Sequence, residues 1–143
     1  MLPLRITVLH PPAGVTLAVQ RGKSDLLPPA SISTDAVVFE LSVRVAPRGE
    51  GGEPNLLGPF AHGPPADRFL YVNSGTSAGQ PDSCWTRRAK LKTAGIGWAL
   101  IEEVLGTPGA VLEARIRGAG RDGGPCCATV PLLDGGWHVA RAG

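Results

Sequence analysis

Hydrophobic and polar residues alternate along three stretches of the chain, with the period of two that a half-buried β-strand requires. In residues 2–9 the even positions carry leucine, isoleucine or valine. Residues 15–20 repeat this pattern with valine and leucine at the odd positions. The longest alternation covers residues 36–45, where Phe39 belongs to the apolar row and Glu40 to the polar row. These three segments are therefore predicted to be strands.

The rest of the chain contains shorter strand signals separated by glycine and proline. Five further segments are predicted to be strands: residues 68–73, 84–93, 110–118, 126–133 and 136–141. One segment has helical spacing instead, because Trp98, Ile101 and Leu105 recur at intervals of three and four residues. Gly106 is placed to end this helix after about ten residues.

Eight short strands with one helix and no βα alternation indicate a mainly β fold with a mostly antiparallel sheet. Closing such a sheet removes its unpaired edges, so we expect an eight-stranded β-barrel, with a β-sandwich as the alternative. The chain has 143 residues, a size typical of one domain, and no linker or repeat divides it. We therefore treat residues 1–143 as a single domain.

The composition of the chain adds predictions about its class, its partners and its location. With 43% hydrophobic and 18% charged residues the chain resembles an ordinary globular domain. A net charge of only +2 argues against nucleic acid as a partner. No apolar run is long enough to span a membrane, and no signal peptide is recognised, so we expect a cytoplasmic protein. The three cysteines and three histidines lack the spacing of a zinc site, so we expect no metal and no cofactor.

The central part of the chain carries a series of short motifs: "GPF", "GPP", "RFLYV", "GTSAGQ" and "WTRRAK", in this order. With "VQRGKSD" upstream and "AGIGWALIEEV" downstream, the series resembles a bacterial family catalogued only as a domain of unknown function. The resemblance covers nearly the whole chain. It implies no reaction, cofactor or catalytic residue.

The segment of residues 84–93 is the most informative for function. Trp85, Arg87 and Leu91 share one face of this predicted strand. If that face is internal, the Arg87 guanidinium needs a carboxylate, carbonyl groups or an anionic ligand to offset its desolvation. The alternatives are that Arg87 reaches solvent at one end of the sheet, or that it pairs with an internal acid such as Glu40 or Glu113.

The opposite face of the same strand carries a positive ridge formed by Arg88, Lys90 and Lys92. This ridge suits phosphate contact, but it also suits a solvated surface, and no aromatic row interleaves with it along the sequence. The preceding run of residues 73–80 is rich in glycine and serine. Its backbone N–H groups form an anion nest in one interpretation and an ordinary turn in the other.

Two interpretations of function remain. In the first, the barrel binds a small anionic or carbonyl-bearing molecule, and whether the protein is an enzyme stays open. Arg87 would then stabilise negative charge and His62 would act as general acid or base. The other predicted ligand-binding residues are Phe39, Tyr71, Gln80 and Trp85. In the second interpretation the protein is a structural or interaction module, and in both we expect a homo-oligomer, with a homodimer as the simplest form.

Overall fold

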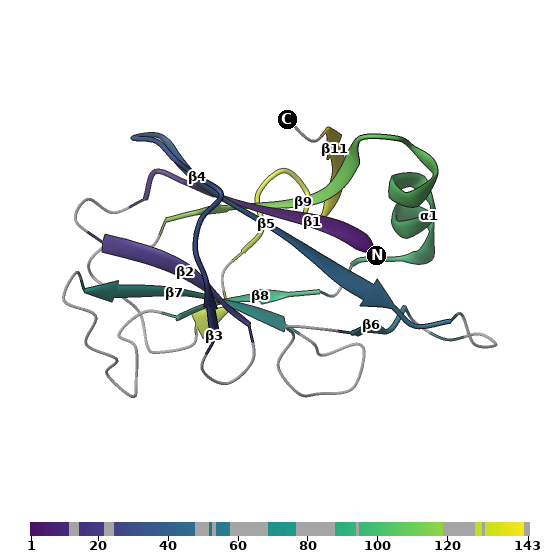
Figure 1. The fold of residues 1–143 in the computed structure, drawn as a ribbon, viewed down its shortest axis with the longest axis horizontal. Coiled ribbons are helices and arrows are strands. Elements are labelled where there is room, and N and C mark those ends of the chain that lie inside the picture. Colours follow the sequence, from purple (N-terminus) through teal and green to yellow (C-terminus); the bar gives the residue numbers. More distant parts are fainter. Residues whose placement is uncertain are drawn as a thin grey trace.

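The alternation along the sequence recurs in the folded chain as two layers of β-sheet (Figure 1). The structure is a computed structural model that describes residues 1–11, 15–21, 25–47, 52, 54–57, 69–76, 88–93, 95–118, 128–129 and 131–141. These residues form eleven strands and one helix, α1. In chain order they are β1 (Leu2–Leu9), β2 (Val15–Arg21), β3 (Asp25–Leu27), β4 (Ser31–Ile32), β5 (Ala36–Val45), β6 (Leu56–Leu57), β7 (Phe69–Thr76), β8 (Arg88–Lys92), α1 (Trp98–Gly106), β9 (Ala110–Arg117), β10 (Ala128–Thr129) and β11 (His138–Arg141).

We call the two layers sheet A and sheet B. Sheet A has the strand order β11-β9-β1-β5-β4, with β6 also paired to β5, and sheet B has the order β10-β8-β7-β2-β3. Strand β1 lies at the centre of sheet A, antiparallel to β5 and parallel to β9. Sheet B likewise contains one parallel pair, β8 with β10. Both sheets are therefore mixed, although most pairings are antiparallel.

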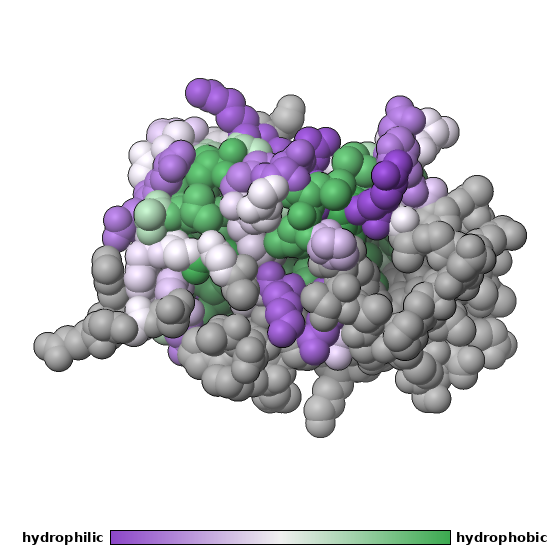
Figure 2. Space-filling model, turned by 180° about the vertical axis from the view of Figure 1, so that it is seen from behind, coloured by the Kyte–Doolittle hydropathy of each residue, from purple (hydrophilic) through white to green (hydrophobic). Residues whose placement is uncertain are grey.

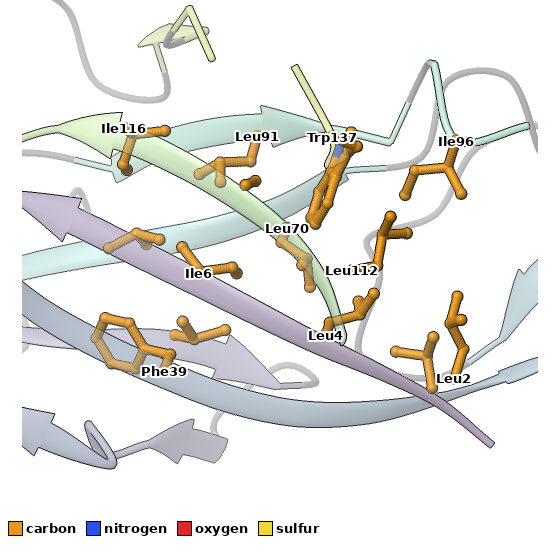
Figure 3. Packing of buried hydrophobic residues seen from close by; sticks show 14 of the residues in the cluster. Leu2, Leu4, Ile6, Phe39, Leu70, Leu91, Ile96, Leu112, Ile116 and Trp137 are labelled. Carbon is orange, nitrogen blue, oxygen red and sulfur yellow. The ribbon is translucent and has the colours of Figure 1, made fainter. Parts of the chain in front are cut away.

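The hydrophobic core lies between the two sheets (Figure 3). Strand β1 contributes Leu2, Leu4, Ile6 and Val8, whose side chains are at most 2% exposed. Sheet B faces them with side chains that are equally buried, namely Val19, Leu70 and Leu91. Because alternate residues of a strand share one face, these rows show that each sheet has one inner face and one outer face.

The predicted eight-stranded barrel is not confirmed, since no closed barrel is found among the described residues. Their strands form two separate sheets instead, each with short strands at its edges. The sequence pattern could not separate these outcomes, because a barrel and a pair of stacked sheets both bury one side of every strand. The three additional strands β3, β4 and β6 have only two or three residues each, too few to show a period.

The helix is confirmed, but it buries a different set of side chains from the predicted one. Ile101 and Val104 are 2% and 3% exposed, whereas Leu105 is 55% exposed. Two buried positions three residues apart make one narrow stripe on this nine-residue helix. The described part of the chain contains no helix with the length and apolar character needed to cross a membrane.

The glycine- and serine-rich run after the predicted strand at residues 68–73 also differs from expectation. Strand β7 continues to Thr76, and residues 73–76 pair with residues 15–18 of β2. The first half of the predicted turn or anion nest is therefore part of the sheet ladder. The second half, residues 77–80, lies outside the described residues.

One polar contact links the two sheets across the core. Trp137, just before β11, is 6% exposed and points inward among the apolar side chains (Figure 3). Its indole Nε1 donates a hydrogen bond of 2.9 Å to the backbone oxygen of Lys92 in β8. The last segment of sheet A is thereby joined to a central strand of sheet B.

We expect Trp137→Phe to lower the free energy of unfolding by about 1–3 kcal/mol, because it retains an aromatic ring but leaves the Lys92 carbonyl without this donor. Urea unfolding measures the change. Trp98→Phe is the matched control, since it removes an indole hydrogen bond to the Gly52 carbonyl in an exposed setting. Equal losses for the two variants would contradict a special role of the buried contact.

Candidate functional site

Four of the six predicted site residues, Arg87, His62, Gln80 and Trp85, lie outside the described residues. Their roles stay predictions. Gln80, Trp85 and Arg87 belong to the segment that connects β7 to β8 in the sequence. The β7–β8 pair is therefore the part of the described fold to which most of the predicted site is attached.

The two remaining predicted residues, Phe39 and Tyr71, lie on different faces of the molecule. Phe39 is fully buried between the sheets, beside Ile6, its register partner on β1 (Figure 3). Tyr71 is half-buried and alternates with the inward-facing Leu70 and Val72, which places it on the outer face of sheet B. Phe39 and Tyr71 therefore do not line one common cavity.

The outer face of sheet B brings a tyrosine next to lysines. Tyr71 is the register partner of Lys90, and the backbone of Phe69 pairs with that of Lys92. Leu91, between the two lysines, is fully buried, so Lys90 and Lys92 share the outer face, as predicted. The sequence predicted Tyr71 as a ligand-binding residue but not its position beside the lysines, because Tyr71 lies on the adjacent strand. The burial of both Leu70 and Leu91 is the signal that fixes this register.

The outer face of sheet A carries a polar cluster centred on the carboxylate of Glu113, which is only 7% exposed. Arg5 Nε donates to Glu113 Oε2 over 2.6 Å, and Thr7 Oγ1 donates to the same oxygen over 2.9 Å. His138 Nε2 lies 3.0 Å from Glu113 Oε1. We refer to these four residues as the Glu113 cluster.

Strand register assembles the Glu113 cluster. Arg5 is the parallel register partner of Glu113, and His138 is its antiparallel partner on the other side. The guanidinium of Arg5 also donates from Nη1 to the backbone oxygen of Arg141 over 2.7 Å. Sequence spacing could not reveal this cluster, since 108 residues separate Arg5 from Glu113.

The Glu113 cluster has the geometry of a structural ion pair rather than of an acid–base catalyst. Burial alone would raise the pKa of Glu113, but the hydrogen bonds from Arg5, Thr7 and His138, with the charge of Arg5, lower its pKa below the ordinary value. Both ring nitrogens of His138 already face acceptors, because Nδ1 lies 3.0 Å from the Gly136 oxygen. Both nitrogens are therefore held by contacts within the fold.

Among the described residues, no three histidine, cysteine, aspartate or glutamate side chains are arranged to hold a metal ion. Figure 2 shows hydrophobic and hydrophilic side chains interleaved over the described part of one face.

Comparison with known proteins gives one match. A protein-family model described only as a family of unknown function matches residues 2–140. No curated protein and no solved structure matches the chain. The geometry of the chain itself is therefore the basis for a functional proposal.

We expect Glu113→Gln to lower the free energy of unfolding by about 2–3 kcal/mol near neutral pH, because it leaves Arg5 without its charged partner. Since the folded state lowers the pKa of Glu113 from 4.5, the stabilisation is complete above that pH and is lost as the pH falls through the folded-state value. Urea midpoints at a series of pH values measure both effects.

The difference between the natural chain and the Glu113→Gln variant should therefore shrink steadily as the solution is acidified below 4.5. Glu40→Gln serves as the control, because Glu40 is an exposed carboxylate on the same face of sheet A. A difference that is independent of pH would show that the charge of Glu113 is not what stabilises the fold.

Proposed function

The chain belongs to DUF5990, a family of unknown function, and we propose that it binds a small anionic molecule on the outer face of sheet B. The main evidence for this site is the strand register. Tyr71 lies directly across from Lys90, and Lys92 lies two residues further along the same face. Two ammonium groups and a phenol hydroxyl all donate hydrogen bonds, which is the chemistry that an oxyanion requires.

The distances between these positions suit one compact ligand. Directly opposed residues of antiparallel strands have Cβ atoms about 5 Å apart, and alternate residues of a strand are about 6.6 Å apart. The long lysine side chains of Lys90 and Lys92 can therefore converge on the same carboxylate or phosphate. Lys90 is half-buried, which strengthens a charge–charge contact relative to a fully solvated one.

The packing between the sheets supports an outer site over an internal one. Phe39, Ile6 and Leu70 are fully buried side chains that occupy the space where a barrel would hold its ligand (Figure 3). We therefore infer that the ligand predicted for the barrel interior binds outside the described core. Binding at this site requires no catalytic step by Arg87 or His62.

We expect inorganic phosphate and pyrophosphate to shift the backbone amide NMR signals of β7 and β8 in a saturable manner. Replacing both lysines, Lys90→Gln with Lys92→Gln, should weaken this binding about tenfold, because each removes one partly solvated charge contact. Added sodium chloride should weaken binding to the natural chain as well.

Arg44→Gln is the matched control, because Arg44 is an exposed cation on β5 of the other sheet. It should leave the phosphate titration unchanged, and urea unfolding should confirm that both variants are folded. Signal shifts spread over all surface cations, or an unchanged affinity in the lysine variant, would refute the proposed site. The interaction-module interpretation, with its expected homodimer, would then be the one to test, by sedimentation.

A further inference from the structure

A shallow cavity of about 380 Å³ lies on the outer face of sheet A, away from the proposed anion site. Its lining comes from three adjacent strands: Pro3 and Leu4 of β1, Glu40, Leu41 and Ser42 of β5, and Val111 of β9. The volume falls within the range of small-molecule sites, which is about 300–1,000 Å³. The cavity opens to solvent and is large enough for one small organic molecule.

The cavity arises from the contrast between two neighbouring rows of the sheet. Ser42 and Pro3 are register partners, and Val111 continues this row of small side chains on β9. The next row is made of long charged residues, Glu40 and Arg5 among them. A row of small side chains beside a row of large ones leaves a hollow that runs across the strands.

Glu40 lines this hollow, and no described side chain pairs with its carboxylate. Its register partner is Arg5, but the guanidinium of Arg5 is turned to the other side, toward Glu113 and the Arg141 carbonyl. Among the described residues, the Glu40 carboxylate forms no hydrogen bond and no ion pair. The negative charge of Glu40 therefore lies at the wall of the cavity, and the nearby positive charge of Arg5 is already paired with Glu113.

We propose that this cavity is a second binding site, for a small primary amine with a compact apolar body. The ammonium group would pair with the Glu40 carboxylate and donate to the Ser42 hydroxyl, since both are acceptors. The apolar body would contact Pro3 and Val111. Arg44, an exposed cation that follows Ser42 on the same face of β5, lies outside the cavity lining and disfavours a cation that extends beyond the hollow.

The test uses three probes of equal shape and different charge: benzylamine, benzyl alcohol and benzoate. We expect benzylamine to shift the backbone amide NMR signals of Leu4, Leu41, Ser42 and Val111 in a saturable manner, and the other two probes to bind at least about threefold more weakly. Equal binding of benzyl alcohol, or stronger binding of benzoate, would overturn the proposal.

Two variants locate the site, and a third serves as the control. Glu40→Gln should weaken benzylamine binding about three- to fivefold, whereas Glu103→Gln, which changes an exposed carboxylate on α1, should not alter it. Ser42→Phe fills the hollow from an exposed position and should abolish the shifts without removing the charge. Benzylamine shifts that persist in Ser42→Phe, or an affinity unchanged in Glu40→Gln, would place the amine elsewhere and refute the site. Phosphate binding at β7 and β8 should be unaffected in all three variants, which separates this site from the anion site.

Discussion

The buried carboxylate of Glu113 is the constraint on which the arrangement of sheet A depends. A charge that is almost fully removed from water is tolerated only with close partners, and this one takes them from the two strands beside it. Arg5 and Thr7 come from β1, and His138 comes from β11. A shift of one residue in the pairing of β9 would move Glu113 into the hydrophobic core. The ionic contacts therefore fix the register that the apolar rows also require.

The outer faces of the two sheets differ in the arrangement of their charged side chains. On sheet A, Arg5 and Glu113 form an ion pair, and the exposed carboxylate of Glu40 lies beside a hollow without a partner among the described residues. On sheet B, Lys90 and Lys92 lie together on the outer side of one strand. Because the described core between the sheets consists of apolar side chains, both proposed binding sites lie on these outer faces.

The sequence was informative wherever a strand was long enough to show its period. The inner rows of β1 and β5 follow the alternation residue by residue, and the helix begins and ends close to the expected positions. The sequence did not predict which distant strands pair, because a local hydrophobic pattern does not identify the partner strand. The Glu113 cluster and the Tyr71–Lys90 register pair are products of such pairing. Phe39 was predicted to bind a ligand, whereas its side chain lies in the core.

The parallel pairing of β1 with β9 also has a consequence for synthesis on the ribosome. Strand β1 can pair with β5 soon after both emerge, but its other edge faces β9, and 108 residues separate Arg5 from Glu113. At about 5–20 residues per second, that edge stays open for roughly 5–20 seconds. An unpaired edge of a strand is a template for association with other chains. The nascent chain is thus exposed to association through this edge of β1 until β9 has been synthesised.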